Sequence, residues 1–288
     1  MGVYNGSFYS KSMNMDTSIG IILPHDSRKH LGVEPLHPGI TPSDKPRTLI
    51  LLHGLSDNWA AWMHRTSILR YAELYDIAVL APEVQRSFYM DMKNGPAYYT
   101  YITQELPELA AKQFHISVAP EDLMIAGLSM GGYGALACGL SNPDRFMGIG
   151  AFSSVADLRK FVLDDDYAGR KELRGWLKDR TGIYGEDLSY PEAMDPYHLV
   201  DEAARREKLP KLYMTCGTED FMHEDNVALK NYMQSKGLNF RYEEWPGEHE
   251  WGFWDVSIQK MLEYFLIGGK EKKYDSQDDE GTGCLWQA

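Results

Sequence analysis

Short runs of apolar and β-branched residues alternate along the chain with longer stretches in which apolar residues recur at helical spacing. The short runs predict strands at residues 17–24, 48–54, 77–82, 122–127, 146–153, 211–217 and 240–245. The longer stretches predict helices near residues 61–74, 96–114, 129–141, 223–236 and 251–266. This alternation is typical of a mostly parallel sheet covered by helices on both faces, so we expect an α/β fold.

Three segments depart from this alternation. No helical stretch separates the first two apolar runs, so the N-terminal part is expected to form an antiparallel edge of the sheet. Residues 154–209 contain no strand-like run, and a connection of this length in a compact domain is usually a functional insertion with short helices. Residues 268–288 are polar and lack apolar periodicity, which favours a mobile tail. We therefore expect a single domain over residues 1–267.

The composition excludes some classes of partner. A chain of 288 residues, 43% of them hydrophobic, is long enough to bury a large core. Its formal net charge of −13 argues against a nucleic-acid partner, which would require a basic surface. No apolar segment is long enough to span a bilayer, and no secretory signal pattern follows Met1. We therefore expect a cytoplasmic protein without a membrane partner.

Neither a metal nor a cofactor is expected. The cysteines are far apart and odd in number, which fits neither a disulfide framework nor a metal-binding pair: Cys138, Cys216 and Cys284. His249 does not begin the H-E-x-x-H zinc motif, because the position four residues later is Phe. The chain also lacks a complete dinucleotide-binding or phosphate-binding glycine loop.

The segment Gly127-Leu128-Ser129-Met130-Gly131 lies between the predicted strand at 122–127 and a predicted helix. A G-x-S-x-G pattern in a strand–turn–helix context is the nucleophile elbow of α/β-hydrolases. The glycines allow strand and helix to approach, and the helix N-terminus offers backbone N–H groups to a developing oxyanion. Ser129 is therefore the candidate nucleophile, and the amide of Met130 is one candidate oxyanion donor.

A nucleophilic serine requires a histidine base, and the histidine requires a carboxylate to orient it. In this fold the acid follows the serine along the chain and the histidine follows the acid. The predicted strand at 211–217 is followed by two acids, Glu219 and Asp220, and their spacing alone does not separate them. Both acids are expected at the carboxyl edge of the sheet, where open α/β sheets bind ligands.

The histidine is chosen by its position relative to a strand. His249 follows the predicted strand at 240–245, which places it at the same edge as Ser129. His198 lies within the insertion, and His223 begins a predicted helix shortly after Asp220. Since neither of these two follows a strand of its own, His249 is the preferred base.

The predicted strand at 48–54 supplies a second candidate element. It ends in His53 and Gly54, and Leu55 follows. A strand end of this kind can offer a backbone N–H to the oxyanion, so we expect the amides of Leu55 and Met130 to form the hole together. In that case His53 has a structural role.

Aromatic residues suggest where substrate binds. Trp59 and Trp62, shortly after the oxyanion segment, are candidates for the acyl side, and Trp176 in the insertion is a candidate for a cap over the site. Aromatic faces suit a sugar ring or a phenolic acyl group. Aromatic residues in an insertion more often pack into a small core of their own.

Four segments carry a resemblance to a known family: "LLHGLSDNWAAW", "AGLSMGGYGAL", "CGTEDF" and "GEHEWGFW". With them, the chain resembles the esterase D and tributyrin esterase group of α/β-hydrolases. This group is related to feruloyl and acetyl-xylan esterases and to S-formylglutathione hydrolase. The family pattern G-x-x-D falls on Gly217 and Asp220, which favours Asp220 over Glu219. The pattern G-x-H-x-W falls on His249 and on Trp251, a further candidate for substrate contact.

The resemblance implies a serine carboxylesterase of the α/β-hydrolase fold, free of cofactor and metal. It implies short-chain acyl esters as substrates, with acetyl or feruloyl esters of carbohydrates among the candidates. S-formylglutathione hydrolysis or acyl transfer would use the same triad, and a non-catalytic binding module is a further alternative. The expected partner is a small-molecule ester, and a homo-oligomer is an open expectation.

Overall fold

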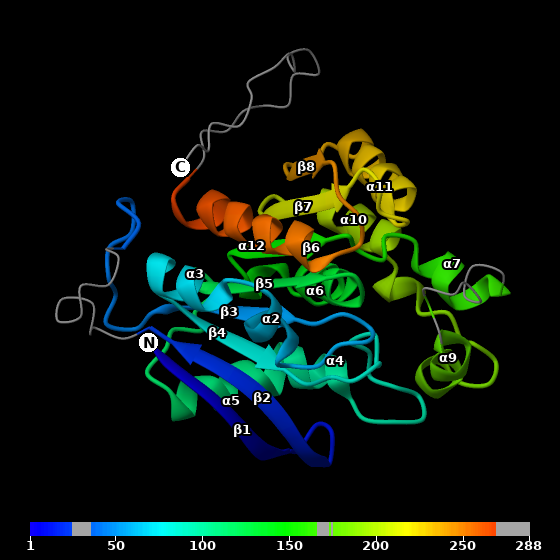
Figure 1. The fold of residues 1–288 in the computed structure, drawn as a ribbon. Helices are drawn as coiled ribbons and strands as arrows, with labels where there is room; N and C mark the ends of the chain where they lie inside the picture. The colour runs from blue at the N-terminus through cyan, green and yellow to red at the C-terminus, as the bar shows by residue number, and fades with distance from the viewer. Residues whose placement is uncertain (25–35, 166–172, 174, 269–288) are drawn as a thin grey trace, which may run out of the picture.

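The computed structural model describes residues 1–24, 36–165, 173 and 175–268. Its core is one sheet with the strand order β1-β2-β4-β3-β5-β6-β7-β8 (Figure 1). The strands are β1 Gly2–Ser10, β2 Met15–Leu23, β3 Arg47–Leu52, β4 Ile77–Pro82, β5 Leu123–Leu128, β6 Gly148–Phe152, β7 Lys211–Gly217 and β8 Arg241–Trp245. The predicted tail, apart from Gly268, lies outside the described residues.

The strands β3 to β8 run parallel, whereas β1 and β2 form an antiparallel edge. This arrangement confirms the expected fold class and the antiparallel N-terminal edge. The sequence analysis missed β1, which pairs with β2 from Gly2↔Leu23 to Ser10↔Met15. Strand β1 is mostly exposed and contains two glycines, so it lacks the apolar run by which the other strands were found.

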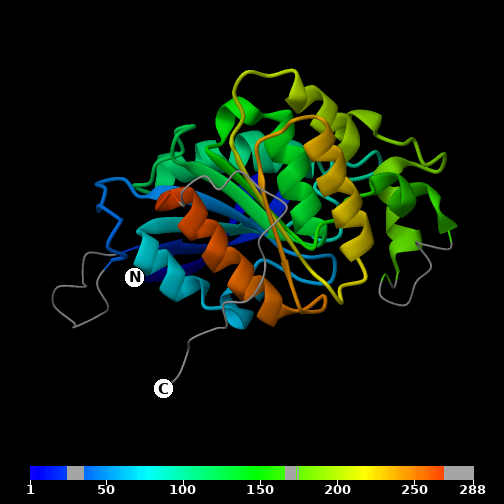
Figure 2. The same cartoon turned by 90° about the horizontal axis from the view of Figure 1, so that it is seen from above.

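Helices cover both faces of the sheet (Figure 2). Alternate residues of β3 show the two sides: Leu49 and Leu51 pack with Tyr71 of α3 and Ile258 of α12, whereas Ile50 faces the core on the other side. The first layer consists of α2 Ala61–Arg65, α3 Ile68–Tyr75 and α12 Trp251–Leu266. The second consists of α4 Tyr98–Thr100, α5 Leu106–Gln113, α6 Met130–Ser141, α10 Pro196–Ala204 and α11 His223–Ser235.

Two predicted helices are interrupted. The stretch expected at 61–74 forms α2 and α3, which are separated at Thr66, whose hydroxyl donates to the carbonyl of Trp62. The stretch expected at 96–114 contains a π-helical turn at Tyr101–Glu105. Pro107 follows this turn and has no N–H to donate four residues back, so a regular α-helix cannot continue through it.

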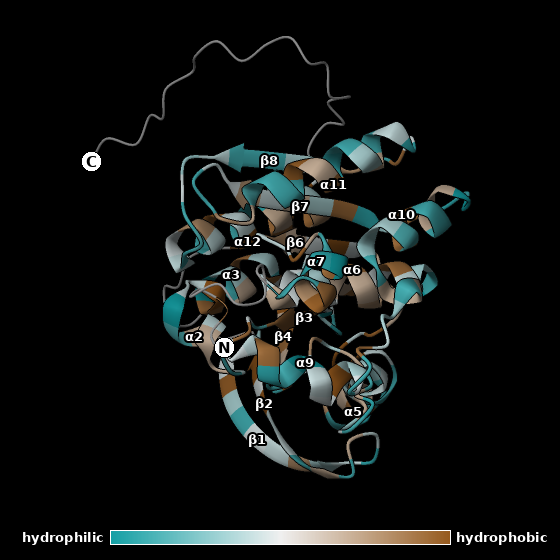
Figure 3. Ribbon diagram, turned by 90° about the vertical axis from the view of Figure 1, so that its right-hand side faces the viewer, coloured by the Kyte–Doolittle hydropathy of each residue, from teal (hydrophilic) through white to brown (hydrophobic). Residues whose placement is uncertain are grey.

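The insertion after β6 contains short helices in its described parts. These are α7 Leu158–Leu163, α9 Trp176–Tyr184, a 3₁₀ turn at Glu192–Met194, and α10. Helices α7 and α9 lie beyond the end of the sheet (Figure 1). At the far edge of the sheet, β8 is largely hydrophilic (Figure 3). In the part of the chain that the structure describes, no helix combines the length and apolarity that crossing a bilayer would require.

Candidate active site

Ser129 occupies a strained turn between β5 and α6. Its backbone has φ 54° and ψ −117°, a conformation that residues other than glycine rarely adopt. The Ser129 N–H donates to the carbonyl of Phe152 at 2.8 Å, and Val155 N–H donates to the Ser129 carbonyl at 3.4 Å. The turn is therefore held against the end of β6, and the serine sits at the carboxyl edge of the sheet.

The neighbouring glycines are required by close backbone contacts. A Cβ atom on Gly127 would lie 2.5 Å from the backbone of Gly131, and one on Gly131 would lie 2.5 Å from the carbonyl oxygen of Leu52. No side chain fits at either position without moving β3 or α6. The structure thus supplies the reason for the glycine pattern from which Ser129 was predicted.

His249 and Asp220 are brought together from the loops after β8 and β7. The Nδ1 atom of His249 lies 2.9 Å and 3.0 Å from the two carboxylate oxygens of Asp220. A proton on Nδ1 leaves Nε2 as the basic nitrogen of the neutral ring. Burial alone would raise the pKa of Asp220, but hydrogen bonds from His249 and from the amide of Met222 lower it below its ordinary value.

Hydrogen bonds distinguish the two candidate acids, Glu219 and Asp220, which the sequence spacing alone did not separate. The exposed carboxylate of Glu219 accepts the N–H of Gly247 in the loop before His249. Asp220, whose side chain has no exposed area, contacts the ring directly. The rival histidines lie elsewhere: Nε2 of His223 is 3.1 Å from Glu244, and His198 lies on α10.

Ser129 and His249 line the same cavity, which has a volume of about 500 Å³. Leu55 and Met130, the residues expected to supply the oxyanion amides, also line it. The amide of Met130 is at the start of α6, where the first N–H groups have no carbonyl partner within the helix. Aromatic residues complete much of the wall: Phe88, Phe161, Phe221, Trp251 and Trp254.

The segment with the candidate oxyanion amide is fixed by the loop after β4. His53 is almost fully buried, its Nδ1 is 2.8 Å from the carbonyl oxygen of Gly54, and its Nε2 accepts the N–H of Val84 at 3.3 Å. The Tyr89 hydroxyl donates to the carbonyl of His53 at 2.8 Å. Arg86 donates to the carbonyl of Leu55 at 3.2 Å. Both ring nitrogens of His53 are therefore occupied, as expected of a structural histidine.

Of the four tryptophans proposed to contact substrate, Trp251 lines the cavity. Trp62 and Trp176 are fully buried in the hydrophobic core, where their indole N–H groups donate to the carbonyls of Leu52 and Phe161. Trp59 packs over Gly20 of β2. The residues described as lining the cavity include none of these three, so their placement corrects the expectation. Aromatic residues of the insertion such as Trp176 pack into the core, because burial removes their large apolar surface from water.

Sequence reasoning also missed parts of the site. The cavity wall includes Phe88, Phe161 and Trp254, and the loop that supports the oxyanion segment includes Arg86 and Tyr89. Trp254 ends the segment "GEHEWGFW", but the other four residues belong to no local motif. They reach the site from the loop after β4 and from α7, which are far from Ser129 in the sequence, so a single sequence contains no signal for their convergence.

Among the described residues, no cluster of three or more His, Cys, Asp or Glu side chains is arranged to hold a metal ion. Cys138 and Cys216 are buried, and burial raises the pKa of both thiols, which keeps them neutral. The described residues thus offer acid–base and nucleophilic chemistry at the carboxyl edge of the sheet.

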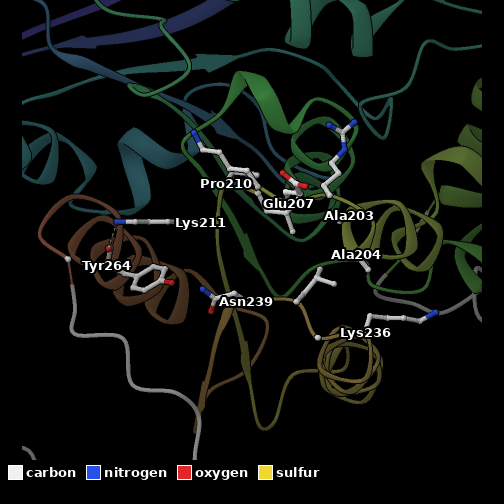
Figure 4. A pocket seen from close by; sticks show the side chains of 14 residues that line it. Ala203, Ala204, Glu207, Pro210, Lys211, Lys236, Asn239 and Tyr264 are labelled. Carbon is white, nitrogen blue, oxygen red and sulfur yellow. Dashed lines mark hydrogen bonds between the residues drawn. The ribbon is translucent and has the colours of Figure 1, made fainter.

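A second cavity, of about 560 Å³, lies at the opposite edge of the sheet (Figure 4). It is lined in part by Lys211 at the start of β7 and by Asn239 before β8. Lys211 donates to the carbonyl of Phe265 at 2.9 Å, and Lys236 lies 2.5 Å from the carboxylate of Asp201. No serine or histidine lines this cavity among the described residues.

A sharp serine elbow, a histidine held by a buried carboxylate and a parallel sheet define a serine hydrolase of the α/β-hydrolase type. The chain matches the model of the Esterase family over residues 10–265, and it belongs to this family. It is a serine ester hydrolase. These matches favour an enzyme over a non-catalytic binding module.

Individual relatives agree with this assignment. The chain is 32% identical to an acetyl esterase of Caldicellulosiruptor saccharolyticus over 271 residues, which cover 92% of this chain and 98% of the relative. Its fold is similar to that of FphF, the fluorophosphonate-binding serine hydrolase F of Staphylococcus aureus, with a TM-score of 0.77, 29% identity and coverage of 92% and 98%. It is also similar to the S-formylglutathione hydrolase FrmB of the same organism, with a TM-score of 0.74, 30% identity and the same coverage.

Proposed function

We propose that the enzyme hydrolyses short-chain acyl esters with Ser129 as nucleophile, His249 as general base and acid, and Asp220 as the orienting carboxylate. The observation that carries this proposal is the contact between His249 and the buried Asp220, with His249 and Ser129 in the wall of one cavity. The backbone amides of Leu55 and Met130 are proposed to bind the oxyanion.

The reaction has two halves. In acylation, the Ser129 hydroxyl attacks the ester carbonyl while its proton passes to Nε2 of His249, and the oxyanion amides stabilise the negative charge on the former carbonyl oxygen. His249 then gives this proton to the leaving alcohol, and the acyl group remains on Ser129. In deacylation, a water molecule repeats these steps, releasing the carboxylic acid and restoring the serine. The negative charge of Asp220 stabilises the imidazolium in both halves.

The volume and the aromatic walls of the cavity favour a small substrate. A volume of about 500 Å³ with aromatic walls accommodates a short acyl chain and a compact alcohol better than a long-chain lipid. The similarity to an acetyl esterase points in the same direction. Acetyl and feruloyl esters of carbohydrates are proposed substrates, because aromatic faces pack well against sugar and phenol rings. A panel of acetylated and feruloylated sugars, compared by kcat/KM, tests this choice.

S-formylglutathione is a second candidate substrate. The 30% identity to the S-formylglutathione hydrolase FrmB favours it, and the same nucleophile would attack its thioester carbonyl. The test compares S-formylglutathione with p-nitrophenyl acetate. A kcat/KM at least about 100-fold higher for the thioester, equivalent to about 2.7 kcal/mol, would make it the preferred substrate. Transfer of the acyl group to an added alcohol would instead identify an acyltransferase.

The decisive experiment on the proposed mechanism is labelling by a fluorophosphonate, which reacts with activated serines. We expect one adduct, on Ser129, and its loss in the Ser129→Ala variant. The cytoplasmic location and the homo-oligomer stay predictions. Fractionation of cells that produce the protein checks the first, and light scattering during size-exclusion chromatography checks the second.

A further inference from the structure

Arg86 connects the candidate oxyanion segment with the insertion. Its Nη1 donates to the carbonyl of Leu55 at 3.2 Å, and its Nε donates to the carboxylate of Asp179 on α9 at 2.6 Å. The side chains are only 34% and 26% exposed, so solvent screens this ion pair less than a fully exposed one. A guanidinium presents several N–H donors in one rigid plane, which allows Arg86 to hold both groups at once.

The contact with the carbonyl of Leu55 restricts the backbone beside the candidate oxyanion amide. A peptide unit is planar, so holding its carbonyl oxygen also sets the direction of its N–H. The unit that contains the N–H of Leu55 has the carbonyl of Gly54, which lies 2.8 Å from Nδ1 of His53. Arg86 holds the carbonyl of the next unit. The two contacts therefore fix the backbone on both sides of the Leu55 Cα atom.

The loop that carries Arg86 has an unusual backbone. Gln85, Phe88 and Tyr89 adopt φ of 51°, 53° and 56°, in the left-handed region that residues other than glycine rarely occupy. Strain of this kind persists where surrounding contacts hold it, and it often lies at functional sites. Here the hydroxyl of Tyr89 donates to the carbonyl of His53 at 2.8 Å. The loop thus holds two carbonyls of the oxyanion segment, those of His53 and Leu55.

Helix α9 gives Asp179 a fixed position. The indole N–H of Trp176 donates to the carbonyl of Phe161 on α7 at 2.7 Å, and Arg180 donates to a second carbonyl of α7 at 3.0 Å. The ring of Trp176 also packs against Phe88, with centroids 4.3 Å apart. Phe88 and Phe161 both line the cavity. Asp179 therefore anchors Arg86 to a helix that is attached to the cavity wall.

We propose that Arg86 is a positioning residue, which acts with Asp179 to hold the candidate oxyanion amide of Leu55 in the direction that the transition state requires. The proposal rests on the proposed function, because it concerns the same oxyanion hole. Neither Arg86 nor Asp179 is among the described residues that line the cavity, so both act through Leu55 rather than on the substrate. The insertion contributes to catalysis through this ion pair.

The first test is the Arg86→Met variant, which keeps a long apolar stem and removes every donor. We expect kcat with p-nitrophenyl acetate to fall about 10-fold, because complete loss of an oxyanion donor costs about 100-fold or more and the amide is here displaced rather than removed. Acylation and deacylation both pass through an oxyanion, so KM should stay within about twofold. Arg86→Lys keeps the charge on a single nitrogen and should recover part of the lost kcat.

A second measurement isolates the oxyanion hole. Trifluoroacetone adds to an activated serine, and the oxygen of the adduct occupies the position of the oxyanion. Its inhibition constant should rise in Arg86→Met by about the factor by which kcat falls. Acetone, which forms no stable adduct, should inhibit the parent and the variant equally. A merely structural role of Arg86 would not produce this difference between the two ketones.

Lys93→Met is the matched control. Lys93 lies in the same loop after β4, and its ammonium group is 3.2 Å from the carboxylate of Asp187, which follows α9. The variant removes an ion pair between the same two segments and leaves Arg86 in place. The backbone contact between Lys93 N–H and the carbonyl of Ile183 also remains. We expect the parental kcat and the parental inhibition by trifluoroacetone.

A double variant tests whether Asp179 acts through Arg86. Asp179→Ala removes the anchor but leaves the donor to Leu55, so kcat should fall by only about threefold. Arg86→Met combined with Asp179→Ala should be no slower than Arg86→Met alone. A further loss in the double variant would show that Asp179 acts independently, and would overturn the coupling. Asp179→Ala and Arg86→Lys also serve if Arg86→Met does not fold.

The inference is overturned if Arg86→Met keeps the parental kcat, or if its kcat falls while its inhibition by trifluoroacetone stays parental. It is also overturned if Lys93→Met loses as much activity as Arg86→Met, because the loss would then come from the packing of the insertion. Substantial activity in Ser129→Ala would instead refute the proposed function. Silent Arg86 variants in an enzyme that Ser129→Ala inactivates refute this inference alone.

Discussion

Two cavities among the described residues lie at opposite edges of the same sheet, and the larger of this pair is not the candidate active site. The cavity at the amino edge has about 560 Å³, against about 500 Å³ for the cavity at the carboxyl edge. At the amino edge, Lys211 donates to the carbonyl of Tyr264 (Figure 4), and Lys236 forms an ion pair with Asp201. At the carboxyl edge, a strained serine and a histidine face the space. Chemistry, rather than volume, distinguishes the site.

The difference follows from the direction of the strands. Parallel strands place all their carboxyl ends at one edge, so the loops after β3, β5, β7 and β8 meet there. Each loop brings one candidate group: Leu55, Ser129, Asp220 or His249. The amino edge receives strand starts and the C-terminal end of α12, whose last carbonyls accept hydrogen bonds from Lys211.

The largest effect on kcat is expected when the candidate nucleophile is removed, which tests whether the carboxyl edge of the sheet is the active site. Ser129→Ala should lower kcat by about 10⁴-fold or more, because the remaining groups stabilise charge but form no acyl-enzyme. Steady-state hydrolysis of p-nitrophenyl acetate measures the effect, and circular dichroism controls for folding. Activity within tenfold of the parent would move the chemistry away from the carboxyl edge.

The second effect separates the two neighbouring acids. Asp220→Asn should lower kcat by about 10³- to 10⁴-fold, because an amide would favour the wrong tautomer of His249. Glu219→Gln is the matched control, and it should change kcat by less than about threefold, since its carboxylate bonds to the backbone of Gly247. A reversed ranking would show that Glu219 orients the histidine in the working enzyme.

Glu219 and Asp220 also show how much of the active site can be predicted from the sequence. The elbow at Ser129 and the strands that end before Leu55, Asp220 and His249 are local patterns, and the sequence analysis found them. The spacing of Glu219 and Asp220 could not separate them, because the choice depends on which side chain turns toward the loop after β8. The resemblance favoured Asp220, and the contact at 2.9 Å agrees with it.

Tertiary packing explains what the sequence analysis missed. Trp176 was expected near the substrate, but the insertion buried it between Phe88 and Phe161, with ring centroids 4.3 Å and 5.6 Å away. Strand β1 is stabilised by pairing with β2 rather than by burial, so its residues carry little apolar pattern.

The third effect concerns pH. The lowered pKa of Asp220 keeps this carboxylate ionised above pH 5, so the acid limb of kcat/KM should report one group, the imidazole base. Activity should rise as the pH increases, because only the neutral form of the imidazole can accept the serine proton. A profile of kcat/KM between pH 5 and about 8 measures this. A flat profile in single-turnover acylation would contradict a histidine base.

The fourth effect is a preference among acyl chains. We expect p-nitrophenyl esters with about two to four carbons to be cleaved about 10-fold faster, by kcat/KM, than those with eight or more, because a cavity of about 500 Å³ with aromatic walls favours a small acyl group. A series from acetate to decanoate measures the preference. A maximum at eight or more carbons would indicate an open groove, and the cavity at the carboxyl edge would then be only part of the binding site.

The smallest effect is expected at the amino edge. Lys211→Met removes the donor to the carbonyls of Tyr264 and Phe265 at the end of α12. Because such contacts at a helix C-terminus contribute modestly, Tm should fall by about 1 °C while kcat and KM stay unchanged. Differential scanning calorimetry and the ester assay measure both. A Lys211→Met variant with normal Tm but a changed KM would mean that the second cavity also binds substrate, and the distinction between the two edges would fail. We expect the second cavity to take no part in catalysis, because the direction of the strands places none of the four candidate catalytic groups at the amino edge.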